Sequence, residues 1–263
     1  TRINQVVVPE KLRERYAFHA NGDERLRFVT KLYGGLGITP STVTLLTGTP
    51  GSGKSTLLLQ ISDALQRRGY CVVLFNGCEE SIQQTRMVCE RIFRHVPTFF
   101  VGHDSLVHED SPDMCHKVFN DVRVGRRRTI TQHAALLREM HPDKQIVILH
   151  DSLQTADDGK YPDESMNGQT PVRALKLINE HCKRTFDSAI IIGQVTKAGD
   201  ALGSNRLIHN IDVWMHLWID NVDRSDTQGK RLIETRKNRY GCSGSCFILE
   251  MMPDGLKEEG SLF

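Results

Sequence analysis

The sequence lacks the features that mark several classes of protein. No apolar run approaches the ~20 residues of a membrane-spanning helix, and no secretory leader opens the chain. The seven cysteines form no CxxC pair, and the closest two, Cys242 and Cys246, have no second Cys or His pair at zinc-ligand spacing. A formal net charge of +2 is too small to indicate nucleic-acid binding by itself. We therefore expect a soluble cytoplasmic protein with reduced thiols, no zinc centre and no membrane segment.

Apolar strand patterns alternate with helical patterns along most of the chain. Five such runs are typical of a parallel sheet covered on both faces, and they span 43–47, 71–75, 98–101, 145–150 and 189–193. Three further strand patterns follow with only polar turns between them, at 213–219, 231–236 and 246–251. These predict antiparallel hairpins that extend the sheet. The expected fold class is α/β, with a mainly parallel twisted sheet, helices on both faces and an antiparallel C-terminal extension.

The length of 263 residues fits one large domain. We assign residues 31–263 to that domain and residues 1–30 to a partly helical N-terminal arm, for which packing on a neighbouring subunit is one role. Residues 102–128 form an insertion, because an α/β connection is normally only a few residues long. The arginine-rich run 123–128 within it has two interpretations that stay open, a solvated charged face and a contact with phosphates.

A complete phosphate-binding loop joins the first strand pattern to the first helix. Its residues 48–55 read Gly-Thr-Pro-Gly-Ser-Gly-Lys-Ser. The glycines allow a tight turn that aims backbone N–H groups at phosphate oxygens, and the helix N-terminus adds partial positive charge. Lys54 is expected to reach the β- and γ-phosphates of ATP and Ser55 to ligate Mg²⁺. The expected nucleotide-binding residues are Gly48, Pro50, Gly51, Ser52, Gly53, Lys54, Ser55 and Thr56.

Polar residues that follow other strands complete the predicted ATP site. Asp151 ends a buried strand, where a carboxylate would hold Mg²⁺ together with Ser55. Glu79 and Glu80 follow the second strand, and one of them would deprotonate the attacking water; Glu79 is the preferred candidate. Gln194 follows the strand 189–193 and would sense the γ-phosphate. All of these positions lie at the carboxyl edge of the sheet, where doubly wound folds bind ligands.

The motifs together resemble one known family. They are Tyr33-Gly34-Gly35, the loop and helix 49–60, Glu79-Glu80-Ser81-Ile82-Gln83-Gln84, Asp151-Ser152-Leu153-Gln154-Thr155, Gly193-Gln194-Val195-Thr196-Lys197 and Lys237-Asn238-Arg239-Tyr240-Gly241. From about Leu32 to Met251 the chain is similar to the ATPase core of the RadA (Sms) family, bacterial DNA-repair relatives of RecA and of the DnaB helicase. The last motif is close to the Lys-Asn-Arg-Phe-Gly signature that distinguishes RadA from RecA.

The resemblance implies a RecA-like fold and a hexameric, ATP-driven motor on single-stranded DNA. In such rings ATP lies between subunits, so Lys237 and Arg239 would reach a neighbour's γ-phosphate as catalytic fingers. The loops that follow Thr155 and Lys197 correspond to DNA-facing loops. The residues expected to hold the DNA backbone are Lys160, Lys197, Asn205 and Arg206.

Three departures from the family pattern narrow this expectation. The zinc ribbon and the Lon-protease-like domain of RadA are absent from the sequence, Gln194 replaces a histidine, and the insertion 102–128 is foreign to the pattern. These losses suit a bacterial protein or a phage protein in a bacterial host. The leading expectation is an ATP-dependent translocase or helicase in recombination, repair or replication. A strand-exchange protein that forms RecA-type filaments and a KaiC-like regulatory ATPase that never moves DNA are the alternatives.

Overall fold

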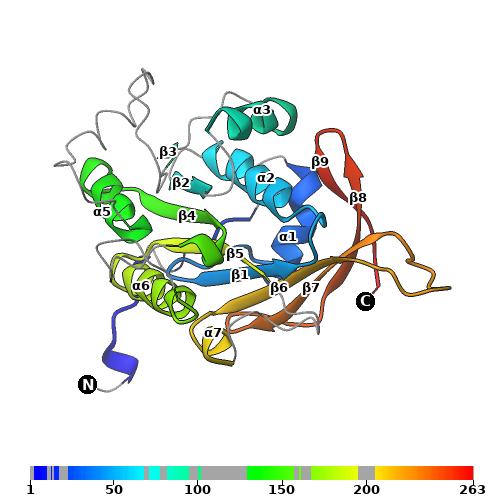
Figure 1. Cartoon of the computed structure of the whole chain (residues 1–263). Helices are drawn as coiled ribbons and strands as arrows, with labels where there is room; N and C mark the ends of the chain where they lie inside the picture. The colour runs from blue at the N-terminus through cyan, green and yellow to red at the C-terminus, as the bar shows by residue number, and fades with distance from the viewer. Residues whose placement is uncertain are drawn as a thin grey trace.

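The fold is built around one twisted sheet, seen edge-on in the middle of Figure 1. The computed structural model describes residues 3–10, 13, 15–17, 23–67, 71–77, 82–94, 100–101, 129–156, 160, 167–194 and 205–262. Within these residues nine strands pair in the order β3-β2-β4-β5-β1-β6-β7-β8-β9. The strands are β1 (Val43–Gly48), β2 (Cys71–Gly77), β3 (Phe100–Val101), β4 (Gln145–Asp151), β5 (Ser188–Gly193), β6 (Val213–Ile219), β7 (Arg231–Asn238), β8 (Cys246–Met252) and β9 (Gly255–Ser261).

The pairing is parallel from β3 to β6 and antiparallel from β6 to β9. This confirms the predicted mainly parallel sheet and its antiparallel C-terminal extension. The strand β9 was missed, because its sequence Gly-Leu-Lys-Glu-Glu-Gly-Ser is too polar to show an apolar pattern. It is held by its ladder with β8 and by Gln60, whose side chain accepts from Leu256 N and donates to Leu256 O.

Helices cover both faces of the parallel part of the sheet (Figure 1). They are α1 (Arg27–Leu32), α2 (Lys54–Gln66), α3 (Ile82–Ile92), α5 (Ile130–Met140), α6 (Thr170–Thr185) and α7 (Asn205–His209), with short 3₁₀ turns η1 (Ile3–Gln5), η4 (Glu24–Leu26) and η5 (Leu153–Thr155). Successive strand residues point to opposite faces, so Leu46 packs with α1 and α2 while Leu45 packs with α5 and α6. Every residue of β1 is buried, as expected for a strand covered on both sides. No helix among the described residues is long and apolar enough to cross a bilayer.

Part of the predicted N-terminal arm belongs to the domain core. Leu26, Phe28 and Val29 are buried in the same cluster as the helix α2. The segment is also fixed by charge, because the buried Asp23 accepts from Arg25 Nη2 at 3.0 Å and from Arg67 Nη2 at 2.7 Å. Burial alone would raise the pKa of Asp23, but these arginines bring it below its ordinary value. The same cluster contains Tyr16, so the core includes residues well before the expected boundary at residue 31.

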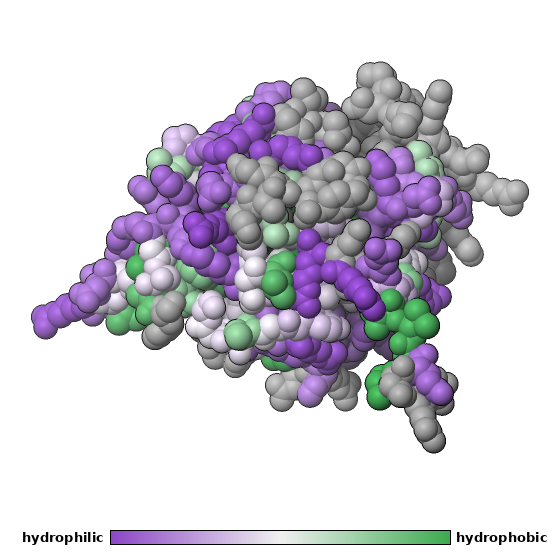
Figure 2. Space-filling view, turned by 180° about the vertical axis from the view of Figure 1, so that it is seen from behind, coloured by the Kyte–Doolittle hydropathy of each residue, from purple (hydrophilic) through white to green (hydrophobic). Residues whose placement is uncertain are grey.

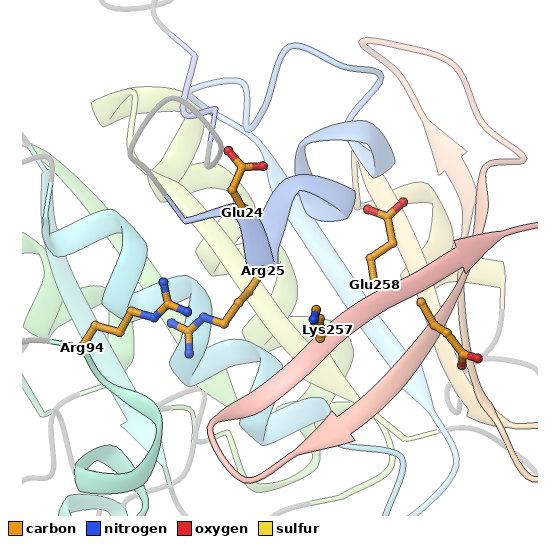
Figure 3. A pocket seen from close by; sticks show the side chains of 6 residues that line it. Glu24, Arg25, Arg94, Lys257 and Glu258 are labelled. Carbon is orange, nitrogen blue, oxygen red and sulfur yellow. The ribbon is translucent and has the colours of Figure 1, made fainter.

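A charged pocket lies beside this N-terminal segment (Figure 3). Its lining residues come from η4, the end of α3 and β9, and they are Glu24, Arg25, Arg94, Lys257, Glu258 and Glu259. Arg25 Nη1 donates to Asp254 O at 2.9 Å, and Lys31 Nζ pairs with Glu258 Oε1 at 2.9 Å. The pocket thus lies within ion pairs that tie the N-terminal segment to the C-terminal hairpin.

Candidate functional site

The phosphate-binding loop lies between β1 and α2, as its sequence predicts. Gly51 and Gly53 have positive φ angles of 73° and 105°, and Gly53 caps α2 in a left-handed conformation. A Cβ added at Gly51 would meet no atom within 4 Å, so glycine is favoured there by its positive φ angle and not by lack of space. Gly48 ends β1, Pro50 lies in the turn and Thr56 lies in the first turn of α2. Backbone N–H groups at a helix N-terminus are a ready anion site.

Two side chains of the loop fit a phosphate ligand. Lys54 Nζ donates to Gly48 O at 3.1 Å and to Thr49 O at 2.8 Å, so the ammonium is folded back over the loop. Ser52 is fully buried, and its Oγ has no hydrogen-bond partner among the described residues. A buried hydroxyl without a partner is costly. A phosphate oxygen within the loop would offer both groups an acceptor.

Ser55 and Asp151 meet across the carboxyl edge of the sheet. Ser55 Oγ donates to Asp151 Oδ2 at 2.5 Å, although 96 residues separate them in the sequence. Hydroxyl and carboxylate oxygens are ligands that Mg²⁺ accepts, and these two come from the loop and from the end of β4. No cluster of three His, Cys, Asp or Glu side chains suited to a metal occurs in the part of the chain that the structure describes. Ser55 and Asp151 are therefore the candidate residues for Mg²⁺.

The remaining predicted catalytic residues at this edge are only partly described. Glu79 and Glu80 lie outside the described residues, but β2 ends at Gly77, which pairs in register with Asp151. Gln194 is exposed directly after β5, whose last residue Gly193 pairs with Thr47 of β1. The backbone thus brings Gln194 beside the loop.

A polar and aromatic cluster under the loop was missed by sequence reasoning. On β6, Trp214 Nε1 donates to Thr47 Oγ1 at 2.8 Å, and His216 Nδ1 lies 2.9 Å from the same oxygen. Thr47 Oγ1 also lies 3.2 Å from Met215 O, so one hydroxyl of β1 contacts three consecutive residues of β6. Burial, with the charges of Arg236 and Lys54, lowers the pKa of His216 to about 4. His216 is therefore neutral at physiological pH.

The signal for this cluster lies in the strand periodicity. Residues 214, 216 and 218 of β6 alternate with buried apolar ones and so share a face. The neighbouring β6–β7 hairpin also contacts the loop, since Arg231 Nε donates to Ser52 O and Ile219 N to Thr49 Oγ1. Without the pairing of β6 with β1, the sequence does not show that this face meets Thr47.

Lys237 and Arg239 lie at the opposite edge of the sheet from the loop. Asn238 pairs with Val213 at the start of β6, whereas Gly48 pairs with Leu217 near its end. Arg239 Nη1 donates to Asp212 Oδ1 at 3.1 Å, and Lys237 Nζ donates to Ile208 O and Ile211 O at 2.6 and 2.7 Å. The structure does not bring these two residues to the ATP site of their own chain.

The predicted DNA contacts are mostly beyond the described side chains. Lys160 is exposed in the connection after β4. Lys197 lies outside the described residues, and Asn205 and Arg206 begin α7 with their backbone alone described. The connections after β4 and β5 leave the same sheet edge as the phosphate-binding loop.

Comparisons with known proteins show the family of this chain. A family model described as AAA ATPase domain matches residues 23–162, more than half of the chain. The DNA repair protein RadA of Campylobacter jejuni is 27% identical over 244 residues, which are 92% of this chain and 46% of that protein. RadA of Mycobacterium tuberculosis is 29% identical over 87% of this chain and 42% of its own length. RadA of Chlamydia pneumoniae is 30% identical over 87% of this chain and 43% of its own length. The chain thus spans less than half the length of the relatives it matches.

A solved structure supports the fold independently. The KaiC-like protein PH0186 from Pyrococcus horikoshii superposes with a TM-score of 0.59 at 16% sequence identity, over 85% of this chain and 91% of that one. At this identity the likeness concerns the fold alone. The predicted RecA-like fold class and the resemblance to the RadA core are confirmed. This chain belongs to the family of AAA ATPase domains and is an ATP hydrolase.

Proposed function

We propose that the chain is an ATP-driven motor on single-stranded DNA, a translocase or helicase that acts in recombination, repair or replication. We propose further that it works as a homo-oligomer, in the form of a hexameric ring. The relatives named DNA repair protein RadA support the biological setting. The division of the site between two edges of the sheet supports the oligomer.

The observation that carries the proposal is the distance between Arg239 and the phosphate-binding loop of its own chain. Asp212 holds Arg239 and also accepts from Val43 N, at the start of β1. Gly48 lies five positions after Val43 along this extended strand, which is about 16 Å at ~3.3 Å per residue. An arginine side chain anchored at that edge does not span this distance to its own γ-phosphate. A catalytic role for Arg239 therefore requires the ATP site of another chain.

Each residue of the proposed site has a defined task. Lys54 would hold the β- and γ-phosphates, and Ser55 with Asp151 would hold Mg²⁺, which neutralises phosphate charge when bound. Glu79 would orient and deprotonate water, with Glu80 as the alternative, and Gln194 would contact the γ-phosphate through its amide. Arg239, and Lys237 beside it, would stabilise the charge that develops on the neighbour's transferring phosphoryl group.

DNA is proposed to lie along the connections that follow β4 and β5. Lys160, Lys197, Asn205 and Arg206 would contact its phosphates, and such contacts carry no base specificity. Because both connections start beside the phosphate-binding loop, nucleotide state and DNA contact would be linked through Gln194 and Asp151. The basic run 123–128 stays the second candidate for a DNA contact.

Mixing two inactive variants tests the shared site. Arg239→Ala is expected to bind ATP with little change and to lose most hydrolysis, because the missing charge matters in the transition state. Glu79→Gln should likewise bind and fail to turn over. In mixed oligomers some interfaces combine an intact Glu79 with an intact Arg239, so partial ATPase activity should return. If mixed oligomers form but their ATPase activity does not return, Arg239 does not act in trans.

Imaging distinguishes the three functions under consideration. Negative-stain micrographs with an ATP analogue and oligo-dT should show closed rings for the proposed motor. Helical filaments on the DNA would favour a RecA-type strand-exchange protein. Oligomers that do not bind the DNA would favour a KaiC-like regulatory ATPase.

A further inference from the structure

We propose that Asp212 is the positioning residue for Arg239: its buried carboxylate fixes the guanidinium on the surface that would meet a neighbouring subunit. The inference rests on the proposed trans role of Arg239. It adds a residue that none of the sequence motifs contains, because Asp212 lies 27 positions before Arg239 and outside every motif.

Both oxygens of the Asp212 carboxylate are used, and they connect two different elements. The side chain is 1% exposed. Its Oδ2 accepts from Val43 N at 3.0 Å, at the first residue of β1, and its Oδ1 accepts from Arg239 Nη1 at 3.1 Å. A buried carboxylate is costly unless both charge and hydrogen bonds are supplied, which these two donors do. Asp212 thereby connects β1, which leads to the phosphate-binding loop, with Arg239.

Main-chain hydrogen bonds reinforce the same junction. Asp212 N donates to Val43 O at 2.9 Å, and Arg239 N donates to Asp212 O at 3.0 Å. Arg239 is therefore held through its backbone and its side chain by one residue. The turn is further packed against the N-terminal region, since a Cβ added to Gly34 would lie 3.0 Å from Gly241 Cα. The position of Arg239 is thus set by contacts to one buried residue, Asp212.

Lys237 and Arg239 differ in how many of their side-chain N–H donors are already used within the chain. The Lys237 ammonium is committed to two carbonyls near the end of α7, and burial lowers its pKa. The Arg239 side chain is 45% exposed, and its described contacts to Asp212 and His209 O use two of the five N–H donors of a guanidinium. Arg239 is the better placed of the two for a phosphate across an interface, with Asp212 fixing its direction.

A second aspartate at the same sheet edge provides a matched structural control. Asp187 is fully buried, precedes β5, accepts from Ile146 N at the start of β4 at 2.8 Å, and pairs with Arg138. Asp212 likewise precedes a strand, β6, accepts from the start of β1 and pairs with Arg239. Asp187 differs in that its Oδ2 also accepts from Thr185 Oγ1 at 2.7 Å and lies 2.9 Å from His181 Nε2. Arg138 is proposed for no catalytic role. Loss of either aspartate should therefore cost stability, but only Asp212 should affect the neighbour's ATP site.

The first experiment compares Asp212→Asn with Asp187→Asn. Asparagine keeps one acceptor oxygen and places an NH₂ donor against either Val43 N–H or Arg239, both of which are donors. For Asp212→Asn we expect kcat of the ATPase to fall about tenfold or more, while the affinity for an ATP analogue changes less than about threefold. Asp187→Asn should lower the melting temperature at least as much, because Asp187 has more side-chain partners, and should leave kcat within about twofold. An unchanged kcat in Asp212→Asn, or equal losses of kcat in both variants, would overturn the proposal.

The second experiment asks which side of the interface Asp212 serves. Asp212→Asn mixed with Glu79→Gln should regain ATPase activity, because each chain spoils a different half of the shared site. Asp212→Asn mixed with Arg239→Ala should regain none, since both damage the same half. If Arg239→Ala and Glu79→Gln recover together whereas Asp212→Asn and Glu79→Gln do not, Asp212 has no positioning role.

The same set of mixtures separates failure of this inference from failure of the proposed function. No recovery with Arg239→Ala and Glu79→Gln would mean that Arg239 does not act in trans. Where that control does recover, the double variant Asp212→Asn/Arg239→Ala decides the coupling. Its kcat should equal that of Arg239→Ala alone, and a further loss would show that Asp212 acts independently of Arg239.

Discussion

The neutral histidine under the phosphate-binding loop predicts a specific pH dependence of stability. The pKa of His216 is lowered to about 4 in the folded protein, from 6.5 in an unfolded chain. As the pH falls below 6.5, the unfolded state takes up a proton that the folded state does not bind, so stability is lost. For this pair of values the loss is about 2 kcal/mol at pH 5 and about 3 kcal/mol at pH 4. Above pH 7 the group contributes no pH dependence.

The assay is urea unfolding of the wild type and of His216→Asn between pH 7.5 and 4.5. Asparagine can keep a donor near Thr47 Oγ1 but does not titrate. The difference in unfolding free energy between the two proteins should shift in favour of the variant by about 2 kcal/mol as the pH falls to 5. The exposed His209 provides the control, and His209→Asn should follow the wild type. If His216→Asn also follows the wild-type curve, the pKa of His216 is not lowered in the folded state and the reasoning is wrong.

Three further predictions concern binding and assembly. Lys54→Ala should abolish tight binding of a fluorescent ATP analogue, whereas Glu79→Gln should keep binding and lose ~10²–10⁴-fold in turnover; normal turnover in Glu79→Gln with none in Glu80→Gln would transfer the role to Glu80. Binding to oligo-dT, measured by fluorescence anisotropy, should require ATP and weaken steeply as the salt concentration rises. Neutralising both Lys197 and Arg206 should make this salt dependence less steep. If it does not, residues 123–128 become the candidate DNA contact. Deletion of residues 1–10 should lower the oligomer mass in light scattering, because Ile3 and Val7 are 87% and 85% exposed on the projecting N-terminal segment (Figure 2); an unchanged mass would exclude that segment from the subunit contact.

The sequence located the phosphate-binding loop between β1 and α2, because this motif is local. The loop 48–55 and the helix that it caps are contiguous, so spacing and glycine content define them without tertiary information. Asp151 was chosen as a candidate because it ends an apolar run at the carboxyl end of a strand. The contact of Asp151 with Ser55 confirms that the two strand ends meet, as parallel pairing requires.

The sequence failed where a residue acquires its role from a distant partner. Asp212 resembles any aspartate before a strand until β1 is placed beside β6, and His216 resembles an ordinary strand residue until Thr47 lies under it. Asp23 and Arg25 likewise looked like parts of a polar arm. Their burial follows from Asp63 and Arg67, some 40 residues further along the chain in α2 and just after it.

The proposed two-chain site follows from the geometry of a single pair of strands. β1 and β6 run side by side and in parallel, with the phosphate-binding loop at one end of β1 and Asp212 at the opposite end of β6. The length of the two strands keeps Arg239 about 16 Å from the phosphate-binding loop of its own chain. One subunit would therefore supply the loop to one catalytic site and Arg239 to another. β1 is buried throughout and pairs with β6 from Thr44 to Gly48, so the two half-sites of a chain are joined by a continuous strand ladder. Binding of Arg239 to a phosphate at one subunit interface would then be coupled to the phosphate-binding loop at the next interface. In this proposal Asp212 transmits the coupling, because it contacts both Arg239 and β1.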